Sequence, residues 1–97
     1  MNLQTEAITL VAKEAIENFQ FPETEVLSLS EERAERRYRA EKAMKLGNYF
    51  KDKVKIVFED VEAVKMVETT VWGVTEKNLL LKRGITIPLN RIHEIII

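Results

Sequence analysis

The feature that most constrains this chain is a change in its hydrophobic period near Lys51. Before that point apolar residues recur every three to four positions, as on one face of an α-helix. After it they tend to alternate with polar residues, and β-branched side chains dominate, as in strands with one face in a core. The sequence therefore predicts an α+β protein with a helical part at residues 1–50 and a sheet at residues 51–97.

Two helices are expected in the helical part. The first covers residues 3–19, and its apolar side chains fall at helical spacing. The second covers residues 31–47, because Ser30 can cap its N-terminus and Gly47 offers a left-handed stop at its end. The apolar positions of the second helix are small or scattered, so this helix either packs lightly on the domain or meets a partner.

Five short strands are expected from residue 51 onward. They cover residues 53–59, 64–74, 79–81, 85–87 and 92–97. In the first of them Val54, Ile56 and Phe58 should face the core, and we expect Leu80 of the third to be buried as well. Because no helix crosses over between the strands, the sheet should be antiparallel and should curl into a small five-stranded barrel.

Size and composition exclude several classes of protein. At 97 residues the chain fits one domain, and we expect residues 1–97 to fold as a unit. Hydrophobic residues make up 45% and charged residues 32%, which excludes a fully disordered chain. There is no cysteine, and His93 is the only histidine, so we expect neither a metal centre nor a cofactor.

No apolar run in the sequence is long enough to span a bilayer, and the N-terminus lacks the pattern of a signal peptide. We therefore expect a cytoplasmic protein that does not bind membranes. His93 has no Ser or Asp at the spacing of a triad or dyad. We interpret it as a structural or surface residue, and we expect no enzymatic activity.

Charge is distributed unevenly along the chain. Residues 33–55 hold nine Lys or Arg and three acidic residues, a balance of +6, whereas residues 1–32 have a balance of −6. Residues 56–97 have a balance of −1, which brings the whole chain to −1. The basic segment is either a surface that contacts phosphates or a segment that the preceding acidic residues neutralise within the fold.

Six basic residues form the candidate surface for a partner or a nucleic acid: Arg36, Arg37, Arg39, Lys42, Lys53 and Lys55. Tyr38 lies within this run, and Tyr49 and Phe50 follow the helix, so aromatic rings could stack on unpaired bases of RNA or single-stranded DNA. The charges are also spread around the helix and interleaved with Glu. A solvated helix with internal ion pairs is therefore the competing interpretation.

Two further features could mark interaction sites. Trp72 is interpreted as a core or half-core residue, with an exposed interaction patch as the alternative. Ile95–Ile97 cannot all face one core, because neighbouring residues of a strand point to opposite sides. If the last strand lies at a sheet edge it could pair with a second copy, so a homodimer is one expectation.

The run from Val74 to Ile92, VTEKNLLLKRGITIPLNRI, resembles the second half of Sm-like and SH3-like small barrels. Among these the chain is loosely similar, over roughly residues 51–97, to bacterial Rof-type modulators of the terminator Rho. The resemblance implies a helix and a small barrel that together bind protein. The chain departs from these modulators in its extra first helix and its basic second helix, and it lacks the paired Sm signatures of an RNA-binding ring pocket. No binding residue is therefore carried over.

The first hypothesis from the sequence is a small non-enzymatic binding or regulatory module that acts through contact with a protein partner. Binding of single-stranded nucleic acid through residues 33–55 is the first alternative, and a structural homo-oligomer is the second.

Overall fold

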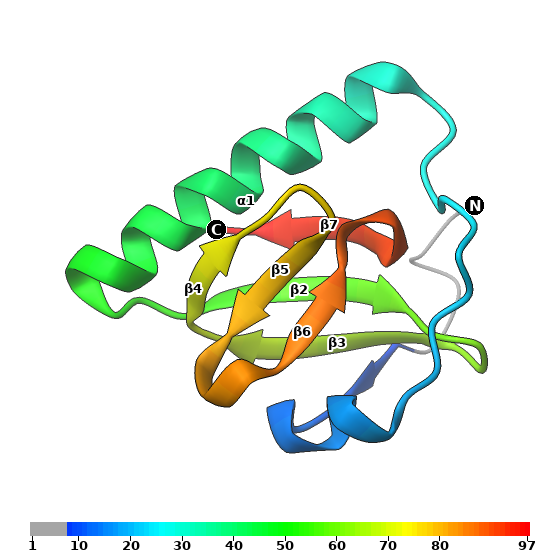
Figure 1. Ribbon diagram of the computed structural model, residues 1–97, viewed down its shortest axis with the longest axis horizontal. Coiled ribbons are helices and arrows are strands. Elements are labelled where there is room, and N and C mark those ends of the chain that lie inside the picture. The colour runs from blue at the N-terminus through cyan, green and yellow to red at the C-terminus, as the bar shows by residue number, and fades with distance from the viewer. Residues whose placement is uncertain (1–7) are drawn as a thin grey trace.

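The computed structural model describes residues 8–97, which form one long helix and seven strands (Figure 1). The helix, α1, spans Ser30–Phe50. The strands are β1 (Thr9–Leu10), β2 (Val54–Glu59), β3 (Val64–Thr69), β4 (Val71–Val74), β5 (Asn78–Leu81), β6 (Thr86–Pro88) and β7 (Ile92–Ile96). They build a four-stranded sheet in the order β1-β3-β2-β7 and a three-stranded sheet in the order β4-β5-β6. Within these residues no helix is both long enough and apolar enough to cross a membrane.

The α+β class is confirmed, but the closed five-stranded barrel is wrong. The predicted strand 64–74 is interrupted at Thr70, so that β3 belongs to one sheet and β4 to the other. Among the described residues no strand pairing joins the two sheets into a cylinder. The other predicted strands correspond in position to β2, β5, β6 and β7.

The predicted first helix is wrong over the residues that the structure describes, and its residues 3–7 lie outside them. Thr9 and Leu10 pair in parallel with β3, and the backbone N–H of Val11 donates to the carbonyl of Met66 at 2.8 Å. Only Lys13–Asn18 is helical, as the short 3₁₀ helix η2. The edge of β3 offers unpaired backbone groups, and pairing with them outweighs the helical spacing of the apolar side chains.

The helix α1 begins and ends differently from the prediction. Its N-cap is Leu29, not Ser30, and the backbone N–H of Leu29 donates to Oε1 of Glu32 at 3.4 Å. Its C-cap is Lys51, which adopts the left-handed conformation with φ = 57°. The backbone N–H of Lys51 donates to the carbonyl of Gly47 at 3.0 Å. The expected stop at Gly47 is thus wrong, because this glycine lies inside the helix.

Gly47 allows α1 to approach β4 closely. The buried positions of the helix are Arg36, Ala40, Ala43 and Gly47, three of which have small side chains. A Cβ atom at position 47 would lie 2.1 Å from the backbone carbonyl oxygen of Val71, which is far inside van der Waals contact. The absence of a side chain at this position therefore fixes the C-terminal part of α1 against the start of β4.

The core confirms one predicted strand face and corrects another. Val54, Ile56 and Phe58 of β2 are at most 3% exposed, as predicted. In β5 the prediction for Leu80 is wrong, because Leu79 and Leu81 are the buried residues and Leu80 is only half-buried. Three consecutive leucines show no alternation, so the sequence pattern cannot tell which of them face the core.

Candidate partner-binding surface

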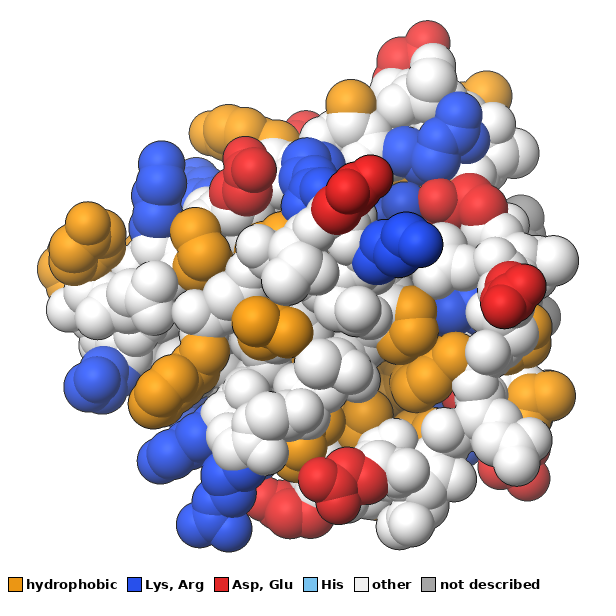
Figure 2. Space-filling model, in the orientation of Figure 1, with side chains coloured by type: hydrophobic (Ala, Val, Ile, Leu, Met, Phe, Trp, Pro, Cys, Tyr) orange, Lys and Arg blue, Asp and Glu red, His pale blue; other side chains and the backbone are white. Residues whose placement is uncertain are grey.

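Basic side chains lie in two different settings on the face shown in Figure 2. Along most of α1 they alternate with carboxylates, and at the end where α1 terminates they gather with hydrophobic side chains. The predicted Arg36, Arg37 and Arg39 belong to α1. Lys51 and Lys53 follow the helix, and Lys82 follows β5.

Arg36 is buried and serves the fold. Its side chain is 9% exposed, and its guanidinium donates to both carboxylate oxygens of Glu25, at 2.6 and 2.7 Å, and to the carbonyl of Ile92 at 3.0 Å. Burial raises the pKa of Glu25, but hydrogen bonds from Arg36 and the Leu27 N–H, with the charge of Arg36, outweigh it. The pKa of Glu25 is therefore below its ordinary value.

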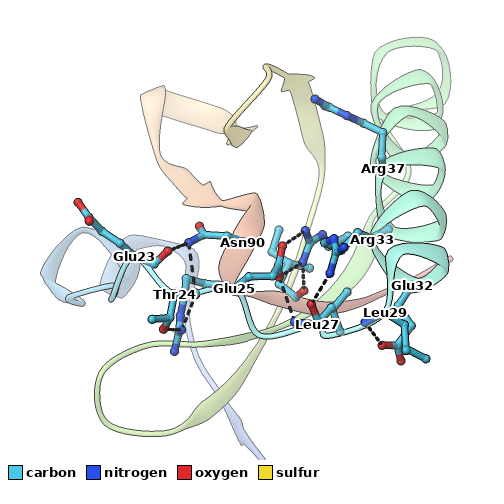
Figure 3. Close-up of polar contacts among 12 residues, drawn as sticks. Glu23, Thr24, Glu25, Leu27, Leu29, Glu32, Arg33, Arg37 and Asn90 are labelled. Atoms are coloured by element: carbon cyan, nitrogen blue, oxygen red, sulfur yellow. Dashed lines mark hydrogen bonds and ion pairs between the residues drawn. The ribbon is translucent and has the colours of Figure 1, made fainter.

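The other two predicted arginines also donate to backbone carbonyls. Arg37 reaches from α1 toward the turn between β4 and β5 (Figure 3). There it donates to the carbonyls of Thr75 at 2.8 Å and Glu76 at 3.2 Å. Arg39 donates to the carbonyl of Ile95 at 3.3 Å. Arg36 and Arg39 thus cover carbonyl groups on β7, which is the edge strand that could pair with a second copy.

The three predicted lysines are exposed, and they lie on three different segments of the chain. Lys42 lies on α1, and Lys55 lies on β2 opposite Glu68 of β3. Lys53 lies in the segment between α1 and β2, and it lines a groove that contains neither of the other two.

That groove brings together residues from four separate parts of the chain. We call it the lysine–tryptophan groove, and the residues that matter for its chemistry are Lys13, Lys51, Lys53, Glu68, Trp72 and Lys82. Its volume is about 350 Å³. Lys13 lies 3.9 Å from Glu14, which also lines the groove. Lys51, Lys53 and Lys82 form no ion pair with any residue within 8–97.

Three aromatic rings are exposed at or near this groove. Trp72 is 50% exposed, because Val71 beside it faces the core and is fully buried. Trp72 was predicted to be a core or half-core residue with an exposed patch as the alternative, and a side chain that is half exposed lies between the two. Tyr49 and Phe50, in the last turn of α1, are 78% and 69% exposed and directly precede Lys51. We call Tyr49, Phe50, Lys51, Lys53, Trp72 and Lys82 the aromatic–lysine surface.

Sequence reasoning found part of this surface. Lys53 was a predicted site residue, and Tyr49 and Phe50 were recognised as possible stacking rings. Lys82 was missed, because it follows β5 and reaches the groove only through the pairing of strands. No local pattern marks such a residue. The one clue was the exposed-patch alternative for Trp72.

His93 lies in a polar cluster away from the groove. Its Nε2 is 2.8 Å from Oε1 of Glu59, and the side chain of Arg91 donates to the backbone carbonyl of Glu59 at 3.0 Å. Arg91 also donates to the carbonyl of Thr24 at 2.8 Å, which holds the segment before α1 in place. Within residues 8–97 no three His, Asp or Glu side chains are grouped so that they could hold a metal ion.

The function of the aromatic–lysine surface has to be argued from its own chemistry. The run that resembles Sm-like and SH3-like barrels forms the chain from the end of β4 to the start of β7. That resemblance remains a prediction. Comparison with protein-family models, with curated proteins and with solved structures finds no match to this chain.

Proposed function

We propose that the protein is a non-enzymatic binding module that contacts single-stranded nucleic acid through the aromatic–lysine surface. The observation that carries this proposal is the proximity of exposed rings to Lys51, Lys53 and Lys82, which form no ion pair with a described carboxylate. Lysines neutralise phosphates, and aromatic rings stack on bases whatever their sequence. Lysines beside aromatic rings therefore match the phosphate and the base of a nucleotide.

A single strand fits this surface better than a duplex. The faces of the bases are available to Trp72, Tyr49 and Phe50 only where the bases are not stacked in a helix. The net charge of the chain is −1, so the attraction is local to one end of the molecule. We therefore expect binding that weakens steeply as salt is added.

Trp72 makes the proposal directly testable, because it is the only tryptophan in the chain. RNA and DNA oligonucleotides of about ten residues match the site sizes of known single-strand binders. We expect them to quench Trp72 fluorescence at low salt as bases stack on the ring. Replacing Lys51, Lys53 and Lys82 by alanine should lower the slope of log affinity against log salt by about 2, since each phosphate contact contributes about 0.7.

The matched control replaces three other lysines, Lys42, Lys45 and Lys77, which are exposed and lie outside the groove. This variant has the same net charge as the first, which makes the two comparable. Because its three lysines lie outside the groove, it should keep the salt slope of the wild type. Absence of binding at low salt would contradict the proposal, as would an equal loss of slope in both variants.

The same assay separates nucleic acid from the protein partner of the first hypothesis. Polyglutamate carries a similar density of negative charge but has no bases to stack on Trp72. Binding of polyglutamate with no binding of oligonucleotides would replace our proposal with contact to an acidic protein. Contact with a protein of the kind implied by the Rof-type resemblance stays a prediction until then.

A further inference from the structure

We infer that Glu68 makes the lysine–tryptophan groove selective for an unpaired guanine base. This inference rests on the proposed function, because it concerns which base occupies the same surface. The inference comes from Glu68, the one acidic side chain lining the groove that forms no ion pair with a described residue. Glu14, which also lines the groove, lies close to Lys13.

The pleat of the chain places Glu68 and Trp72 on the same side. Thr69 and Val71 are 6% and 0% exposed, so they face the core, whereas Glu68 and Trp72 are exposed. Thr70, between them, packs against α1, where its hydroxyl donates to the carbonyl of Lys51. Glu68 and Trp72 both line the groove where β3 passes into β4.

The groove has room for a base. Its volume of about 350 Å³ lies near the lower end of the range for small-molecule sites, about 300–1,000 Å³. Glu68 lines this groove together with Trp72, so a base stacked on the ring would have a carboxylate acceptor in the same groove. Lys51, Lys53 and Lys82 line the same groove and provide the charge that a phosphate needs.

Guanine is the base whose edge best matches a carboxylate. Its N1–H and N2–H groups point in the same direction, so they can donate to the two oxygens of Glu68 at once. Adenine and cytosine present one amino group beside a ring nitrogen that accepts. Uracil presents its N–H between two carbonyl groups, which repel a carboxylate. Lys55 is the cross-strand neighbour of Glu68 and moderates its charge without supplying an acceptor.

The test compares oligouridines that differ at one central position, which carries uridine, guanosine, adenosine or cytidine. A single guanosine avoids the self-association of guanine-rich strands. For the wild-type protein we expect the guanosine strand to bind about tenfold more tightly than the all-uridine strand, as one good bidentate contact predicts. In Glu68→Gln this ratio should fall to about twofold or less, because an amide offers one acceptor in place of two.

The control is Glu41→Gln, which removes the same charge from an exposed position of α1 outside the groove. It should keep the tenfold ratio. If Glu68 only repelled phosphates, Glu68→Gln would bind all four strands more tightly by the same factor, and the ratio of guanosine to uridine affinity would not change. That unchanged ratio would overturn the inference. Equal affinities of the wild-type protein for all four strands would overturn it as well. If either result is obtained while the strands still quench Trp72, the proposed function stands and only the inference about guanine fails. If no strand binds, the proposed function and the inference are both refuted.

Discussion

The two ends of α1 use positive charge in opposite ways. In its first half, arginines turn towards the rest of the protein, where Arg36 binds Glu25 and Arg37 binds the turn between β4 and β5. After its last turn, Lys51 and Lys53 face a groove, and no residue within 8–97 forms an ion pair with either. Both regions belong to the same basic segment of the sequence, so the number of charges does not distinguish them.

The difference teaches that the type of basic residue matters more than its charge. Arginine carries five donors in a rigid plane, so one side chain can bind a carboxylate and a carbonyl together, as Arg36 does. Lysine has a compact and strongly hydrated ammonium group on a flexible stem, which favours exposure. Arginines near a loop and an edge strand therefore indicate internal contacts more often than the same number of lysines would.

Replacing Arg36 should have the largest effect on the first region. Arg36→Met removes the donor of the buried Ile92 carbonyl and leaves the carboxylate of Glu25 only the N–H of Leu27. We expect the free energy of unfolding to fall by about 2 kcal/mol, because the Ile92 carbonyl loses its side-chain donor, whereas the Glu25 side chain is 30% exposed and can be hydrated. Urea denaturation measures this loss. Lys42→Met on the exposed side of α1 is the control and should change stability by less than about 0.5 kcal/mol. An equal loss of stability in Arg36→Met and Lys42→Met would contradict the distinction between arginines that bind within the protein and exposed lysines.

Replacing Lys51 should separate stability from binding in the second region. Lys51 has φ = 57°, a conformation that costs a residue with a side chain about 1 kcal/mol relative to glycine. Lys51→Gly should therefore raise the free energy of unfolding by up to about 1 kcal/mol and lower the salt slope of oligonucleotide binding by about 0.7. Lys53→Gly removes the same charge at a position without positive φ, so it should lower the slope without stabilising the fold. A destabilised Lys51→Gly would show that the lysine serves the fold after all.

Acid should weaken the first region more than the second, and this is the smallest of the three effects. The pKa of Glu25 is below 4.5 in the folded protein, so its contribution to stability is complete above that pH. As the pH falls through the lowered pKa, Glu25 takes up a proton and the contribution is lost. Stability measured by urea denaturation between neutral pH and about pH 3 should thus fall less steeply in Glu25→Gln than in the wild type. An unchanged pH dependence in Glu25→Gln would show that the ion pair adds nothing.

The fold could be predicted where one face of an element is buried and its period is clear. The alternation of β2 placed Val54, Ile56 and Phe58 in the core, and all three are there. The hydrophobic period of the sequence did not predict the structure where a tertiary contact determines it. Thr9 and Leu10 pair with the edge of β3, and the site at which the chain changes sheets, Thr70, carries no signal of its own.

The candidate surface was predicted only in part, because strand pairing assembles it from distant segments. Lys53, Tyr49 and Phe50 are close together in sequence, so a charge run with nearby rings was enough to find them. Glu68 and Lys82 reach the groove from β3 and from the turn after β5. Reasoning along the sequence cannot bring such residues together without the register of the strands.

Gly47 sets the distance between α1 and β4 two residues before the exposed Tyr49. A side chain at this position would meet the backbone carbonyl of Val71 and the methyl group of Thr70, so any larger residue would push the end of the helix away from the strand. The exposed residues that follow Gly47 can consequently be replaced one at a time while the core stays the same. A scaffold of this kind would suit the engineering of new ligand preferences.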